Sequence, residues 1–170
     1  MKNLLIILVC FACSFSADAQ DAVQGFFDKY KDDDNFTQVN ISPKMFQMLS
    51  QMDADEDTDA DVMKMISSLK SLKILTTEIN PMTYYKEFNT LFNQSNYEEL
   101  MTVRDNETDV TFLVRDGDGG NIVKELLLLV GGAKDFVMMR FEGDIPLDKV
   151  GKLASGLNIS GAEHLEKLKK

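Results

Sequence analysis

Four consecutive runs of strand-forming residues constrain the fold of this chain more than any other feature. They lie between Tyr97 and Phe141 and read YEELMTVRD, VTFLVRD, NIVKELLLLV and DFVMMRF. The connectors NET, GDGG and GGAK are short and rich in turn-forming residues, and such connectors join antiparallel neighbours. The sequence therefore predicts an antiparallel four-stranded meander, in which GDGG is a hairpin turn rather than a phosphate or calcium loop.

The flanking segments alternate between helical and strand patterns. Strands are predicted at 36–41 and 72–77, and helices at 22–31, 43–52, 62–69, 81–92, 144–156 and 160–168. Two of the helices have a cap-and-proline start, Ser42-Pro43 and Asn80-Pro81. The fold class is therefore α+β, with helices packed on a mostly antiparallel sheet and residues 20–170 forming a single domain. The connection between the two N-terminal strands is long enough to permit a parallel pair.

The N-terminus has the pattern of a secretory signal peptide. Lys2 precedes an apolar run that is shorter than a membrane span, and an A-x-A site ends at Ala19. We therefore expect residues 1–19 to be removed and the mature chain to be exported to the periplasm or cell envelope, with no transmembrane helix. Both cysteines, Cys10 and Cys13, would leave with the leader, although a lipid anchor at Cys13 is an alternative.

The charge balance limits the partners. The chain has 18 basic and 28 acidic residues, a net charge of −10. Because an acidic surface repels phosphate groups, nucleic acid is not an expected partner. The composition gives no oligomeric state.

Acidic residues supply the candidate metal ligands. Asp53, Asp55, Asp57 and Asp59 stand at alternate positions and offer the oxygen ligands that calcium prefers. The run has no glycine at the sixth position of an EF-hand loop, so a solvated loop is the favoured interpretation. His164 is the only histidine, which argues against a zinc site or a catalytic triad, and no cofactor motif is present. A hydrolase that uses carboxylates stays an alternative.

Apolar residues supply the candidate binding surfaces. Met45, Met48 and Met52 recur at helical spacing, a pattern that favours core packing over a contact surface. The third and fourth strands of the meander are apolar on both faces, so they are either central and covered or leave one face open to a partner. On the second interpretation, the predicted binding residues are Leu126, Leu128 and Met138, on a second face of the sheet.

Several stretches together resemble an uncharacterised family of exported Bacteroidetes proteins, the domain of unknown function 4252. They include FDKYKDDDNFTQVNISPKMF, LKSLKILTTE, ELLLLVGGAKDFVMMRFEGDI and GAEHLEKL. The resemblance implies export and a part in envelope signalling, and it transfers no site residues. The leading hypothesis is a non-enzymatic envelope module that binds another envelope protein. The alternative is a carrier of a small apolar ligand or lipid, held between helices and sheet and lined by Phe88, Phe92, Phe112 and Phe141.

Overall fold

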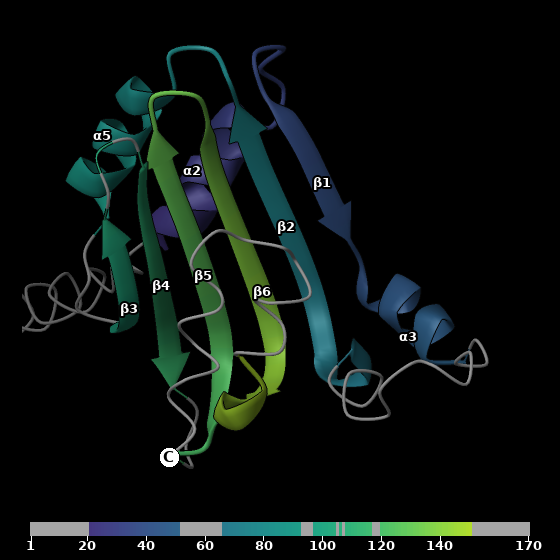
Figure 1. The fold of residues 1–170 in the computed structure, drawn as a ribbon. Coiled ribbons are helices and arrows are strands. Elements are labelled where there is room, and N and C mark those ends of the chain that lie inside the picture. The colour runs from purple at the N-terminus through teal and green to yellow at the C-terminus, as the bar shows by residue number, and fades with distance from the viewer. Residues whose placement is uncertain are drawn as a thin grey trace, which may run out of the picture.

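Six strands form one antiparallel sheet in the order β1-β2-β6-β5-β4-β3 (Figure 1). The computed structural model describes residues 21–51, 66–92, 97–104, 106, 108–116 and 120–150. The strands are β1 Thr37–Ile41, β2 Leu69–Thr77, β3 Glu98–Arg104, β4 Thr108–Asp116, β5 Ile122–Gly132 and β6 Phe136–Pro146. The helices are α2 Ala22–Tyr30, α3 Pro43–Gln51 and α5 Pro81–Leu91, with the 3-10 helix η2 at Leu147–Lys149. The predicted α+β class is confirmed.

The C-terminal meander is present as predicted, and it explains the two-sided apolar strands. β3, β4, β5 and β6 pair in chain order, with Phe112 opposite Leu128 and Leu128 opposite Met139. Because β2 adds to the outer edge of β6, the strands β5 and β6 lie inside the sheet. The interpretation of these two strands as central and covered is therefore confirmed.

The two N-terminal strands form an antiparallel pair, so the parallel alternative is wrong. Thr37 pairs with Thr76 and Ile41 with Leu72, and α3 follows at the end of the sheet where β1 stops (Figure 1). An antiparallel partner must start at that same end, which is where the chain enters β2. β2 begins at Leu69, a residue that the helical spacing had assigned to a helix.

One predicted helix start is confirmed and one differs from the structure. α5 begins at Pro81 after the N-cap Asn80, as predicted, although Asn80 is in the left-handed conformation, with φ 49°, and its side chain makes no capping hydrogen bond. The predicted helix at 144–156 starts too early, because β6 continues to Pro146. Ile145 is buried opposite Val123, which favours a longer hairpin, and proline is tolerated at a strand end.

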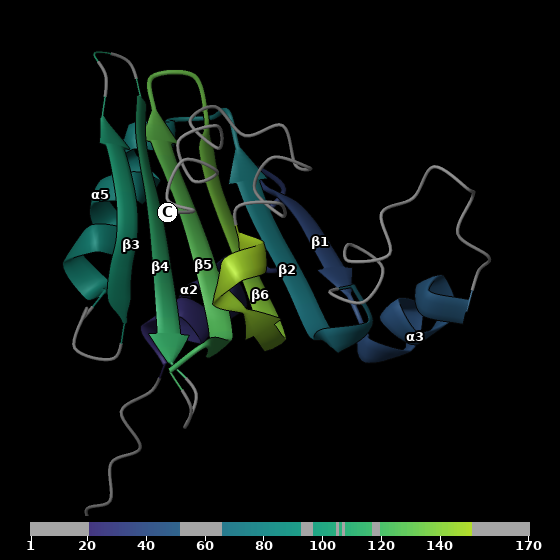
Figure 2. The ribbon, with the colours of Figure 1, turned by 60° about the horizontal axis from the view of Figure 1, so that its bottom comes forward.

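The helices α2 and α5 cover the same face of the sheet (Figures 1 and 2). Phe26 lies at the centre of this cluster and contacts the rings of Tyr30, Phe88 and Phe136. The buried members of this helix-covered face are Val23, Phe26, Phe27, Tyr30, Leu75, Phe88, Leu113, Leu127, Leu129, Phe136 and Met138.

The opposite face of the sheet carries a second apolar cluster. Its buried members are Phe46, Leu69, Leu72, Val110, Phe112, Val114, Val123, Leu126, Leu128, Phe141, Ile145 and Val150. Phe46 brings α3 into this cluster at the β1–β2 side. The sheet is therefore the middle layer between two apolar clusters, which is why its central strands are apolar on both sides.

Candidate functional site

The helix α3 has two apolar faces, and only one of them packs on the protein. Phe46 is buried and Leu49 packs against the same cluster, so this pair attaches the helix to the sheet. Met45 and Met48 are 47% and 54% exposed. Residues three apart share a helix face, so the two methionines form one exposed apolar stripe. The prediction that these methionines are core residues is wrong, because α3 lies beside β1 at the edge of the sheet (Figure 2).

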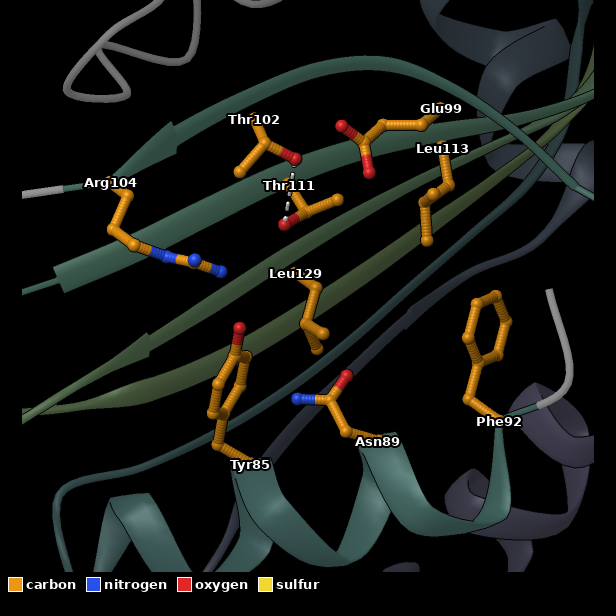
Figure 3. A pocket seen from close by; sticks show the side chains of 9 residues that line it. All are labelled: Tyr85, Asn89, Phe92, Glu99, Thr102, Arg104, Thr111, Leu113 and Leu129. Carbon is orange, nitrogen blue, oxygen red and sulfur yellow. Dashed lines mark hydrogen bonds between the residues drawn. The ribbon is translucent and has the colours of Figure 1, made fainter.

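A cavity of about 410 Å³ lies between α5 and the strands β3, β4 and β5 (Figure 3). Leu113 and Leu129 form its apolar floor, and the Thr102 hydroxyl donates a 3.4 Å hydrogen bond to the Thr111 hydroxyl at its strand side. The full lining is Tyr85, Asn89, Phe92, Glu99, Thr102, Arg104, Thr111, Leu113 and Leu129. Most of these side chains are polar, so the cavity suits a hydrated or hydrogen-bonding occupant better than a lipid.

At one end of the cavity, two of the lining side chains are fixed by hydrogen bonds to Asp109. The Arg104 Nε donates to Asp109 at 2.9 Å, and the Tyr85 hydroxyl donates to the same carboxylate at 3.4 Å. Burial raises the pKa of Tyr85 above its ordinary value. The Tyr85 ring packs on Gly131 so closely that a Cβ there would lie 2.1 Å from Tyr85 Cδ2. Glycine at this position therefore lets α5 approach the sheet.

The four phenylalanines expected to line a carrier cavity do not share one space. Phe88 and Phe92 pack in the helix-covered cluster, whereas Phe112 and Phe141 belong to the opposite cluster. Only Phe92 lines the cavity of Figure 3. The strand alternation placed these residues correctly in the core, but the sequence did not show which face each one joins.

A buried ionic cluster, which sequence reasoning missed, joins the sheet to the start of α2. Glu125 is fully buried and Arg140 is 4% exposed. The Arg140 Nη2 donates to Glu125 at 3.1 Å and to Asp21 at 2.6 Å. Arg140 Nε lies 2.8 Å from Glu125 but is angled away from hydrogen-bond geometry. Glu142 lies 3.0 Å from Arg140 Nη2, so three carboxylates surround this guanidinium.

Further cations and polar groups complete the cluster. Arg115 pairs with Glu125, and the Tyr97 hydroxyl donates to the same carboxylate. The Gln24 side-chain oxygen accepts from Lys73 at 2.7 Å and from Arg140 at 3.2 Å. None of these residues lines the cavity of Figure 3. The cluster therefore acts by fixing α2 on the sheet rather than by contacting a bound molecule there.

Asp21 links this cluster to the helix itself. It is the N-cap of α2, and its side chain accepts a 3.1 Å hydrogen bond from the Val23 amide. Burial alone lowers the pKa of Arg140, but the charge of Glu125 and the hydrogen bond to it outweigh burial, so that pKa is raised. Arg140 therefore stays charged and holds the first turn of α2 at neutral pH.

Tyr97 gives the cluster a pH dependence that can be measured. Burial, and then the hydrogen bond to Glu125, raise the pKa of Tyr97 above its ordinary value of 10.0. Because the pKa of Tyr97 is raised in the folded state, its protonated form stabilises the fold fully below pH 10. Above pH 10 this contribution to the free energy of unfolding falls by up to about 1.4 kcal/mol per pH unit. We expect Tyr97→Phe to lose less stability than the unmodified protein between about pH 8 and about pH 11, as measured by urea unfolding. Equal losses in both proteins would contradict this assignment.

The three predicted binding residues lie in the core and not on one surface. Leu126 and Leu128 belong to the cluster opposite the helices, whereas Met138 belongs to the helix-covered cluster. All three side chains are buried. The expectation that they share one face is wrong. Leu128 pairs with Met139 in the β5–β6 register, and the neighbouring Met138 therefore points to the opposite face of the sheet.

The remaining candidate residues lie outside the described part of the chain. They are the acidic run with Asp53, Asp55, Asp57 and Asp59, and the single histidine, His164. Over the residues that the structure does describe, no group of three or more histidine, cysteine, aspartate or glutamate residues could hold a metal ion. In the same part of the chain, no helix is both long and apolar enough to cross a membrane.

A comparison with models of protein families finds a match over most of the chain. A family model described as "Domain of unknown function (DUF4252)" matches residues 30–153. This range includes every strand of the sheet, the helices α3 and α5, and the cations of the ionic cluster. No curated protein and no solved structure matches the chain.

Proposed function

Because the chain belongs to the DUF4252 family, whose description assigns no activity, we propose a function from its surface: it is an exported, non-enzymatic protein of the cell envelope that binds another envelope protein. The observation that carries this proposal is the exposed stripe of Met45 and Met48 on α3. Export rests on the predicted leader at residues 1–19.

The methionine stripe is suited to binding rather than to folding. α3 is already attached to the sheet through Phe46 and Leu49, so the fold does not require a second apolar face. Methionine side chains are unbranched and polarizable, and they adapt to apolar partner surfaces of different shape. The only charged residue in α3 is Lys44. The partner protein is therefore expected to bind this stripe in an apolar groove. The net charge of −10 on the present chain favours basic residues around the rim of that groove.

A photo-crosslinking residue at position 48 tests the proposal inside the cell. We expect it to capture one envelope protein, and we expect the same residue at the exposed position Thr90 of α5 not to capture that protein. With the purified partner, Met45→Gln/Met48→Gln is expected to weaken binding by about tenfold or more. The matched control Met82→Gln changes an exposed methionine on α5 and should bind normally. Equal binding by the unmodified protein, the double variant and Met82→Gln would refute the role of the stripe.

The localisation is tested in the same cells. We expect the protein in the envelope fraction to begin at Gln20, as read from its intact mass. A cytosolic protein that still contains residues 1–19 would refute export. The crosslinking result at position 48 would be interpreted separately.

The carrier alternative gains less support from the structure. The cavity beneath α5 is lined mostly by polar side chains, and the phenylalanines that would have surrounded an apolar cargo lie on two faces of the sheet. An enclosed apolar space would be needed to hold a lipid. The methionine stripe is therefore the stronger basis for a function.

A further inference from the structure

The strand β1 presents an open edge. It has five residues, and the sheet order places it at the end of the sheet with β2 as its single neighbour among the described strands. Four of its residues are exposed, including Val39 at 39%. An edge strand of this kind offers unpaired amide and carbonyl groups to another strand.

The two edges of the sheet differ in how they are protected. The other edge strand, β3, carries the charges of Glu98, Glu99 and Arg104, and its pairing with β4 is interrupted by a bulge after Glu99. Charges and bulges are the usual means by which proteins prevent pairing at an edge. β1 has neither: its sequence TQVNI contains no charge and no proline, and its pairing with β2 is regular. One edge is therefore blocked and the other is left available.

We propose that β1 pairs with β1 of a second copy of this chain, antiparallel and centred on Val39, so that one sheet runs through both copies. This register places Val39 opposite Val39 of the second copy and Thr37 opposite Ile41. These three residues share the face of the sheet on which Ile41 and Ile74 already pack against the apolar cluster. The pairing therefore covers the exposed Val39 side chain with its own counterpart.

The other face and the strand ends fit the same register. Gln38 faces Asn40 of the second copy, and their amide side chains can hydrogen-bond to each other. Beyond the strand ends, the antiparallel pairing puts the acidic turn at Asp34 of one copy and Lys44 at the start of α3 of the other at the same end of the paired strands. Both side chains are exposed. This opposite-charge contact occurs twice in the symmetric pair, and it favours the antiparallel arrangement over the parallel one.

This edge is separate from the methionine stripe that the proposed function uses. Pairing occupies the backbone of Thr37–Ile41, whereas Met45 and Met48 lie on α3. A five-residue strand pair buries little area, so we expect a weak dimer that forms at about 10 µM or above. Loss of the dimer and loss of partner binding are therefore distinguishable by separate variants.

Cysteine crosslinking tests the register directly. Residues 20–170 contain every described helix and strand and no native cysteine, because both cysteines lie at positions 10 and 13. We expect Val39→Cys to form an intermolecular disulfide under mild oxidation, since directly opposite residues lie within the span of a disulfide. Thr37→Cys should not crosslink to itself, because the two copies of this residue would be about 14 Å apart. Mixing Thr37→Cys with Ile41→Cys should restore the crosslink.

Sedimentation equilibrium supplies a second measurement without cysteine. We expect the average mass of residues 20–170 to rise towards that of a dimer between about 10 µM and about 1 mM. Val39→Lys should remain monomeric, and the matched charge on the other edge, Thr102→Lys, should dimerise normally. Val39→Cys crosslinking no faster than Thr37→Cys, or a monomer at every concentration, would overturn the proposal.

Discussion

Replacing Arg140 with methionine is expected to lower the free energy of unfolding by about 3–5 kcal/mol, the range measured when one member of a buried ion pair is removed. Methionine keeps the length of the side chain and removes its charge. Glu125, which has no exposed surface, would then share its surroundings with Asp21 and Glu142 and keep only the partly exposed Arg115 as a cation partner. The measurement is urea unfolding at neutral pH, read as a shift in midpoint at constant slope.

Two further variants separate charge burial from simple loss of contacts. Arg140→Met/Glu125→Met removes both charges, and it should recover much of the lost stability because no unpaired ion is left in the core. Lys124→Met, on the same strand as Glu125, removes an exposed cation that pairs with Asp144, and it should change stability far less. A double variant as unstable as Arg140→Met alone would show that the loss comes from the contacts of the guanidinium with Asp21 and Gln24 rather than from the charge left on Glu125.

Replacing Phe26 with alanine is expected to lower the free energy of unfolding by about 3–5 kcal/mol through the cavity that it leaves. Phe26 is 1% exposed, and its ring lies 5.4 Å from that of Phe88 and 5.8 Å from that of Phe136. It therefore joins α2, α5 and β6 at one point. Surrounding side chains are also aromatic and cannot easily move into the space, so the loss should lie near the upper end of this range.

The control for Phe26 is an apolar side chain of similar size that lies on the surface. Leu91 is 54% exposed at the end of α5, and Leu91→Ala is expected to stay within about 0.5 kcal/mol of the unmodified protein. Phe26→Leu should give an intermediate loss, because it leaves a smaller cavity. If Phe26→Ala costs no more than Leu91→Ala, the helix α2 does not contribute to the cooperative core.

The ionic cluster shows why the candidate site was only partly predictable from the sequence. Glu125 and Arg140 are charged residues beside the apolar runs of the two strands whose sequence is apolar on both faces. That position was a signal of a buried pair, since a charge in a central strand must find a partner. The partners themselves could not be found this way, because Asp21 and Arg115 come from other elements that the fold brings together.

The methionine stripe was misassigned for a similar reason. Met45 and Met48 have the helical spacing of a core face, and so do Phe46 and Leu49. The spacing shows that α3 has apolar residues on two sides, but it does not show which side meets the sheet. That choice depends on where α3 lies relative to β1 and β2.

Local residue patterns by themselves determined the strands of the meander, the helices α2, α3 and α5, and the α+β class. Alternation, helical spacing and turn-forming residues act over a few positions, so they can be read along the chain. The insertion of β2 beside β6, the separation of Leu126 from Met138, the burial of Glu125 and the open edge at β1 were decided by the tertiary structure alone. Each of these depends on contacts between residues far apart in the chain, and the free energy of such contacts exists only once the strands have taken their order in the sheet.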